Sequence, residues 1–210
     1  MKHDLVIWDF NGTITDDLQL GIDSVNLLLS RRNLPTIDSV ERYHELFRFP
    51  VKDYYAAAGF DFDIYPYEEL AVEWVAEYNK GAPYLKAHDG VADTIDALNA
   101  AGVRQIVLSS SDITMLRSQL SNLGLLDRFD TVLGLDNIYA GGKIELAKKW
   151  GEGKDFSRAI MIGDTTHDYE TARALSADCV LFSGGSEPRA KLLKCGVPVI
   201  DKMPDVLRFI

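Results

Sequence analysis

Short apolar runs recur along the chain, and each run ends at small or acidic residues. Four of them cover residues 5–8, 106–108, 159–162 and 180–182. Their apolar character is continuous rather than alternating, which is typical of strands that are buried on both faces of a parallel sheet. A fifth run predicts a last strand over 197–200, and the residues after it predict a helix over 203–210.

Segments with helical spacing lie between these runs. Apolar residues recur at helical intervals over 91–98, and Asp112 can cap a helix over 113–123 that stops at Gly124. Strands and helices therefore alternate. This alternation predicts an α/β fold whose core is a doubly wound parallel sheet.

The pattern changes after the first run, because helical periodicity dominates from residue 17 to about residue 84. Apolar positions there predict helices over 18–29, 40–47 and 70–78. We therefore expect a small all-helical domain inserted after the first strand, with the division 1–16 core, 17–84 helical cap and 85–210 core. We expect the aromatic residues between 54 and 67 to form the interior of this insert rather than a stacking surface for a ligand.

The charge balance narrows the possible partners. The chain has 210 residues, with 22 Lys and Arg against 32 Asp and Glu, which gives a formal net charge of −10. Such a surface repels nucleic acid and anionic lipid, so we expect neither as the main partner. The first apolar run is too short for a signal peptide or a membrane span, and Cys179 and Cys195 lack the spacing of a zinc site. These features predict a cytoplasmic protein.

Three polar residues follow the apolar runs: Asp9, Ser109 and Asp164. Each of them alone has a structural explanation: Asp9 as a turn residue, Ser109 as a residue between strand and loop, and Asp164 as a helix cap. Together they are expected to meet, because ligands bind beyond the carboxyl ends of parallel strands. With Asp168 and Lys143 they would supply a nucleophile, phosphate-binding groups and ligands for Mg²⁺, which relieves the repulsion between carboxylates.

At these positions the chain resembles the haloacid dehalogenase superfamily, in its phosphoglycolate phosphatase-like branch, over essentially its whole length. Four motifs carry the likeness, and in this chain they are Asp9-Phe10-Asn11-Gly12-Thr13, Ser109-Ser110, Lys143, and Gly163-Asp164 with Asp168. The resemblance implies a Rossmann-like core with a helical cap. It also implies a Mg²⁺-dependent phosphatase, a phosphoric monoester hydrolase, that acts on a small phosphorylated metabolite.

The resemblance also implies roles for single residues. Asp9 would attack phosphorus to give an aspartyl-phosphate, which water then hydrolyses. Mg²⁺ would be held by the Asp9 carboxylate, the backbone carbonyl of Asn11 and Asp164, with Asp168 beside them.

The phosphoryl oxygens would have ligands of their own. Ser109, the amide of Ser110 and Lys143 would orient them and stabilise their charge. In the cap, Arg48 and Lys52 flank residues 49–51 and are predicted to bind a negatively charged leaving group, the alternative being two solvated surface charges.

Asn11 departs from the family pattern, because the family usually has an aspartate there that protonates the leaving group and activates water. An amide cannot do this, so general acid–base help worth about 10² to 10⁴ in rate is in question. His167 is one candidate substitute, the alternative being a solvated loop histidine.

The departure at Asn11 leaves a second reading of function open. In that reading the chain is a catalytically impaired family member that binds a phosphorylated ligand or a protein partner. Two other activities of this fold are less favoured by the sequence. A mutase would depend on the acid that Asn11 replaces. Haloacid dehalogenation needs no metal and would leave Asp164 and Lys143 unexplained.

Overall fold

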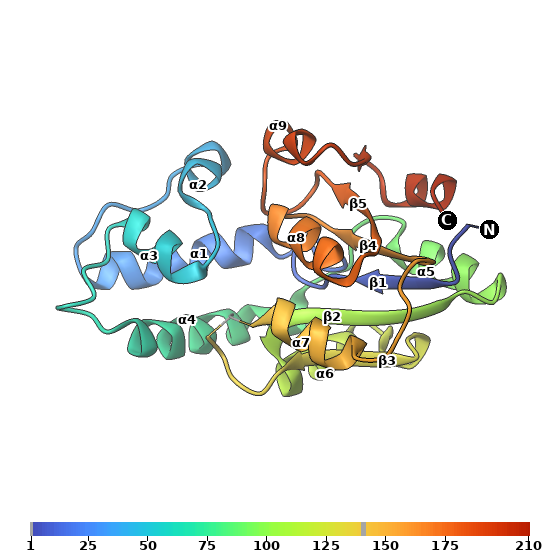
Figure 1. The fold of residues 1–210 in the computed structure, drawn as a ribbon. Helices are drawn as coiled ribbons and strands as arrows, with labels where there is room; N and C mark the ends of the chain where they lie inside the picture. Colours follow the sequence, from blue (N-terminus) through green and yellow to red (C-terminus); the bar gives the residue numbers. More distant parts are fainter. Residues whose placement is uncertain (1, 140–141) are drawn as a thin grey trace.

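A parallel sheet of six strands forms the centre of the larger part of the molecule in the computed structural model, which describes residues 2–139 and 142–210 (Figure 1). The strands are β1 (Leu5–Trp8), β2 (Arg104–Asp112), β3 (Thr131–Leu135), β4 (Ala159–Gly163), β5 (Asp178–Phe182) and β6 (Val199–Ile200). Their order across the sheet is β3-β2-β1-β4-β5-β6, and every neighbouring pair is parallel. The predicted α/β class is confirmed.

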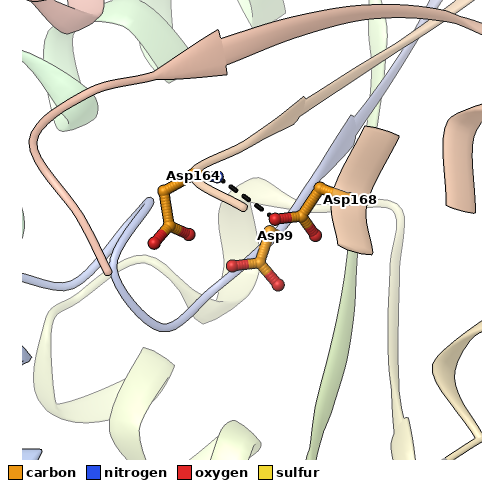
Figure 2. A group of neighbouring side chains, drawn as sticks. All are labelled: Asp9, Asp164 and Asp168. Atoms are coloured by element: carbon orange, nitrogen blue, oxygen red, sulfur yellow. Dashed lines mark hydrogen bonds between the residues drawn. The ribbon is translucent and has the colours of Figure 1, made fainter. Parts of the chain in front are cut away.

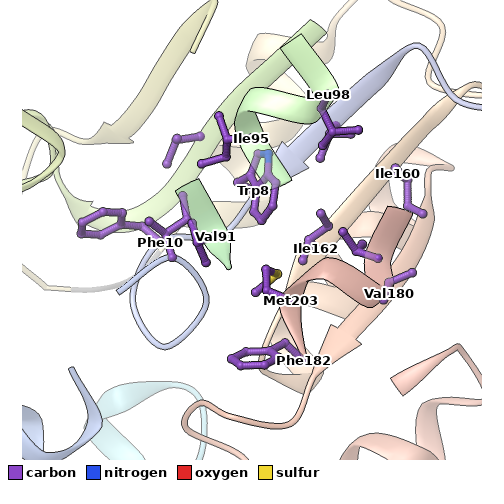
Figure 3. Close-up of a cluster of buried hydrophobic side chains, with 14 of the residues drawn as sticks. Trp8, Phe10, Val91, Ile95, Leu98, Ile160, Ile162, Val180, Phe182 and Met203 are labelled. Atoms are coloured by element: carbon purple, nitrogen blue, oxygen red, sulfur yellow. The ribbon is translucent and has the colours of Figure 1, made fainter. Parts of the chain in front are cut away.

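Helices cover both faces of the sheet. One face carries α5 (Val91–Ala100), α6 (Ile113–Asn122) and the 3₁₀ helix η4 (Met203–Arg208), and the other carries α7 (Lys143–Gly151), α8 (Thr166–Leu175) and α9 (Arg189–Leu192). Shorter 3₁₀ turns are η2 (Leu126–Arg128) and η3 (Leu193–Cys195). In β1, Val6 and Trp8 join the first layer, and Leu5 and Ile7 join the second. Figure 3 shows Trp8 among the side chains of the first layer. This two-sided burial explains why the apolar runs are continuous.

Helices and the loops that join them make up most of the segment between β1 and α5. It contains α1 (Leu18–Arg31), α2 (Val40–Leu46), α3 (Val51–Ala58), α4 (Tyr67–Gly81) and the 3₁₀ helix η1 (Ala82–Tyr84). Its side chains form a separate hydrophobic cluster, in which Val25, Leu28 and Leu70 are fully buried beside Tyr54 and Tyr55. A helical insert after β1 is therefore confirmed, while the exact boundaries after 16 and 84 stay a prediction.

Several elements differ from the sequence prediction. The edge strand β3 was not predicted, because four of its five residues are only half-buried and the apolar signal is weak. The helices α3 and α7 were also missed, and the predicted terminal helix is a 3₁₀ helix that ends at Arg208. Within the described part of the chain, none of the helices combines the length and apolar character of a membrane span.

A buried hydrogen-bond network ties the central strands to α5. Gln105 in β2 is fully buried; its Oε1 accepts from Trp8 Nε1 at 2.9 Å, and its Nε2 donates to the Ile95 carbonyl at 2.9 Å. We expect Gln105→Leu to lower the free energy of unfolding by about 1–3 kcal/mol, because the indole N–H would stay buried without an acceptor. Urea denaturation measures this change.

Gln119 in α6 offers the matched control. It is also buried, but its Oε1 accepts no hydrogen bond from the described residues. Gln119→Leu should therefore cost less than Gln105→Leu. Equal effects of the two substitutions would show that the Gln105 network contributes nothing specific to stability.

Candidate active site

The loop after β1 brings Asp9 to the carboxyl edge of the sheet, between β2 and β4. The Asp9 amide donates to the Ile162 carbonyl at 2.8 Å, which extends the pairing with β4, and its side chain is almost wholly buried. Gly12 then turns the chain with a φ of 75°, and a Cβ at this position would collide with the Asp164 carboxylate. Glycine is therefore required for the close approach of the two loops.

Three buried carboxylates converge at this edge (Figure 2). Oxygens of Asp9, Asp164 and Asp168 lie within 4.8 Å of one another. Asp164 follows β4 and accepts from the Thr13 hydroxyl at 2.9 Å and from the Ser186 amide at 2.6 Å. The predicted meeting of the strand ends is thus present in the structure.

The helix α8 fixes the third carboxylate. Its N-cap is Thr165 rather than Asp164, and Oδ2 of Asp168 accepts from the Thr165 amide at 3.0 Å and from the Thr165 hydroxyl at 2.6 Å. Oδ2 also accepts from the Asp164 amide at 3.2 Å, the bond drawn in Figure 2. Asp168 therefore organises the loop that carries Asp164, and its Oδ1 remains free to bind another group.

That group is Lys143, the first residue of α7. Its Nζ donates to Asp168 Oδ1 at 2.5 Å and also contacts Asp9 Oδ1, and the side chain is almost fully buried. Burial alone lowers the pKa of Lys143, but Asp168 and Asp9 together raise it above its usual value, so the amine stays charged.

The single lysine does not balance the carboxylates. Burial, followed by repulsion from Asp168, raises the pKa of Asp9, and burial with repulsion from Asp9 and Asp168 raises that of Asp164. Three acidic groups against one ammonium leave two uncompensated negative charges when all are ionised. Oxygen donors with this excess charge fit a hard divalent cation such as Mg²⁺.

The serines predicted to bind phosphate line a cavity that two of the three carboxylates, Asp9 and Asp168, also line. Ser109 and Ser110 line it together with Asp9 and Lys143. The strand β2 runs on to Asp112, beyond the predicted apolar run, and its pairing with β3 is irregular between Leu108 and Asp112. Ser109 Oγ accepts from the Ser111 amide at 3.1 Å, which leaves its hydroxyl hydrogen available to a ligand.

Asn11 is held by a network that the sequence did not reveal. Its Nδ2 donates to Asp17 at 2.7 Å and to the Tyr78 hydroxyl at 3.0 Å, and its Oδ1 accepts from the Ser111 hydroxyl at 2.7 Å. Asp17 also accepts from Tyr78 at 2.7 Å and from the Gly12 amide at 2.7 Å. This network fixes the Asn11 amide and joins the insert, through α4, to the loop that carries Asp9.

Residues of the insert and of the core together line a partly open cavity of about 200 Å³ beside these residues. Its aromatic lining consists of Tyr43, Phe47, Phe49, Tyr54, Tyr55, Tyr67, Trp74 and Tyr78. From the aromatic stretch, Tyr54, Tyr55 and Tyr67 belong to the hydrophobic interior of the insert and also line the cavity.

His167 also reaches this cavity. It lies in the first turn of α8, and its ring stacks on Phe49 of the insert, with 4.6 Å between ring centroids and 20° between planes. Burial, with a smaller effect of Lys143, lowers the pKa of His167, so the imidazole is neutral at pH 7. The description as a solvated loop histidine is wrong, because the ring forms a contact between insert and core.

The two predicted cap cations lie elsewhere. Arg48 donates to the carbonyls of Leu46 and Glu45 at 2.8 and 3.1 Å, and the Lys52 ammonium lies 5.2 Å from the centroid of the Phe62 ring. Neither residue lines the cavity. Their binding of a leaving group stays a prediction that this placement does not support.

The family of the chain follows from comparison with known proteins. The family model for haloacid dehalogenase-like hydrolases matches residues 6–182, so the chain belongs to that family, as its motifs indicated. A phosphoglycolate phosphatase of Caulobacter vibrioides is 27% identical over 198 residues, which cover 87% of this chain and 82% of that protein.

A second relative has a different name. The tyrosine-protein kinase PtkA of Mycobacterium tuberculosis is 27% identical over 185 residues, covering 86% of this chain but 62% of that protein, so the chain spans less than two thirds of this relative. Among solved structures, the haloacid dehalogenase-like protein SP0104 of Streptococcus pneumoniae superposes with a TM-score of 0.82 at 19% identity, over 99% of this chain and 98% of that one. The superposition supports the fold with its cap.

The charge imbalance predicts a pH effect on stability. Because the pKa of Asp164 is higher in the folded chain than the ordinary 3.8, folding takes up a proton. Its destabilising charge is thus absent at low pH and appears as the pH rises toward the raised pKa. Without divalent cations, we expect the Tm of the wild type to fall relative to that of Asp164→Asn as the pH rises above the ordinary pKa of 3.8.

Thermal scans with and without Mg²⁺ check this expectation. Saturating Mg²⁺ should raise the Tm of the wild type at neutral pH more than that of Asp164→Asn, since the cation binds the ionised folded state. Parallel pH profiles of the two proteins, together with equal Mg²⁺ effects, would contradict the charge imbalance.

Proposed function

We propose that the chain is a Mg²⁺-dependent phosphatase that hydrolyses a small phosphorylated metabolite through an aspartyl-phosphate at Asp9. Lys143 contacts Asp9 in a cavity that Ser109 also lines, and this arrangement is the main support for the proposal. A carboxylate beside a fixed ammonium and a free hydroxyl donor can attack a phosphoryl group whose oxygens those donors hold. Membership in a hydrolase family supports the same chemistry.

The reaction divides into two displacements. In the first, an Asp9 oxygen forms a bond to phosphorus, the bond to the leaving oxygen breaks, and the electron pair stays on that oxygen. Lys143, the Ser109 hydroxyl and the Ser110 amide hold the three other phosphoryl oxygens. In the second, water attacks phosphorus, the bond to Asp9 breaks, and the water proton passes to solvent as phosphate leaves.

The carboxylates would hold the cation. We propose the Asp9 carboxylate, Asp164 and the Asn11 carbonyl as its ligands, with Asp168 beside them. When bound, Mg²⁺ balances the two uncompensated charges and lowers the repulsion that an incoming phosphate meets. Asp168 keeps a second task, since it holds Lys143 in contact with Asp9.

The alternative is a module that binds a phosphorylated ligand without turnover, and Asn11 is the residue that favours it. The hydrogen-bonded amide has no proton to give a leaving alkoxide. Asp9, Lys143, Ser109 and the other carboxylates nevertheless lie together, and the attack of Asp9 on phosphorus needs no proton from the Asn11 side chain. We therefore propose catalysis that is selective for leaving groups, not its loss.

Removing the nucleophile tests the proposal. Asp9→Asn should lower kcat for phosphate release by about 10⁴-fold or more, because an amide cannot attack phosphorus. Asp16→Asn is the matched control, since Asp16 lies in the same loop but is exposed, and it should keep near-normal activity. Phosphate release from a panel of phosphomonoesters, with and without Mg²⁺, measures both; turnover by Asp9→Asn close to the wild type would refute the mechanism.

A further inference from the structure

The insert presents aromatic rings to the side of the cavity that faces away from the sheet. Phe47 stacks on Tyr43 with 5.0 Å between centroids and meets the edge of Tyr54 at 5.5 Å. Trp74 stacks on Tyr78 at 4.7 Å. All five rings line the cavity, whose volume of about 200 Å³ exceeds the roughly 150 Å³ of an apolar cavity that binds benzene. Such walls favour a further ring between them.

The same side of the cavity lacks positive charge. Among the residues that the structure describes, Lys143 is the single lysine or arginine in the lining, and it is bound to two carboxylates. The carboxyl groups of Asp17 and Asp112 also line the cavity, and neither can neutralise an anion. A carboxylate on the leaving group would lose its hydration here without gaining a cationic partner, which is unfavourable.

The chemistry at Asn11 selects in the same direction. Its amide hydrogens are donated to Asp17 and Tyr78, so the leaving oxygen must depart without a proton from this residue. A phenol has a pKa of about 10, as in tyrosine, and its anion leaves without help, whereas an alkoxide is a far stronger base. Recognition and reactivity therefore favour the same leaving group.

We infer that the cap side of the cavity is a subsite for an uncharged aromatic group, and that the substrates are aryl monophosphates rather than carboxylated esters such as phosphoglycolate. The inference rests on the proposed phosphatase function. In the first displacement the bond between phosphorus and the aryl oxygen breaks, the electron pair remains on the phenolate, and the phenolate takes its proton from water.

Binding tests the subsite independently of turnover and of leaving-group reactivity. Non-hydrolysable phosphonates, titrated into the wild-type protein with Mg²⁺ in a calorimeter, compare the groups directly. Benzylphosphonate should bind about tenfold or more tightly than ethylphosphonate or phosphonoacetate. Equal affinities, or tighter binding of phosphonoacetate, would overturn the inference.

Variants locate the effect. Phe47→Ala should weaken benzylphosphonate binding by about tenfold and leave ethylphosphonate unchanged. Phe62→Ala is the control, because Phe62 packs in the same aromatic cluster but does not line the cavity, and it should change neither affinity. An equal loss for both phosphonates in Phe47→Ala would reduce Phe47 to a structural role and overturn the assignment.

A second variant keeps the inference testable if Phe47→Ala fails to fold. Val75 lines the cavity from α4 and is half-buried, so Val75→Arg adds a cation at the subsite. It should raise the affinity for phosphonoacetate relative to benzylphosphonate, and an unchanged ratio would count against the inference.

Turnover separates this inference from the proposed function. A higher kcat/KM for phenyl phosphate than for phosphoglycolate supports both, while preferred hydrolysis of phosphoglycolate leaves the phosphatase standing and overturns the aryl subsite. Selective benzylphosphonate binding without phosphate release from any ester supports the subsite and refutes the phosphatase.

Discussion

Three carboxylates and one lysine share a buried corner, and their charge imbalance is the constraint on which the site depends. Asp9, Asp164 and Asp168 lie within 4.8 Å of one another, and Lys143 neutralises only part of their charge. Repulsion at this distance in a poorly solvated site is costly unless protons or a cation compensate it. The fold holds these groups together by placing each on a different element: the end of β1, the end of β4, the first turn of α8 and the start of α7.

The helical insert depends on the same corner. The Tyr78 hydroxyl of α4 donates to Asp17, which also accepts from the Gly12 amide and the Asn11 side chain in the loop after β1. Phe49 stacks on His167 of the core. These polar and aromatic contacts hold the insert over the carboxylates, so that its aromatic side chains form part of the cavity wall. Asp9, Asp164, Asp168 and Lys143 are all buried, and charges in such a poorly solvated site interact more strongly than in water.

The sequence predicted the features that depend on local pattern. Continuous apolar runs marked the strands buried on both faces, and the residues after them marked the edge where Asp9, Ser109 and Asp164 meet. The half-buried strand β3 lacks that signal. Contacts between residues far apart in the chain could not be predicted in this way. Nothing in the spacing of Asp17 and Tyr78 indicates that their side chains form a hydrogen bond. Nothing in the residues near Arg48 indicates that its guanidinium donates to a backbone carbonyl.

In the proposed reaction Asp9 carries the phosphoryl group between the two displacements. An aspartyl-phosphate is reduced to homoserine by borohydride, so the protein is mixed with phenyl phosphate and Mg²⁺, quenched with acid, reduced and analysed by peptide mass spectrometry. We expect homoserine at Asp9 only when substrate and Mg²⁺ are both present. Phosphate release without modification of Asp9, or a phosphoryl group carried by Ser109, would contradict it.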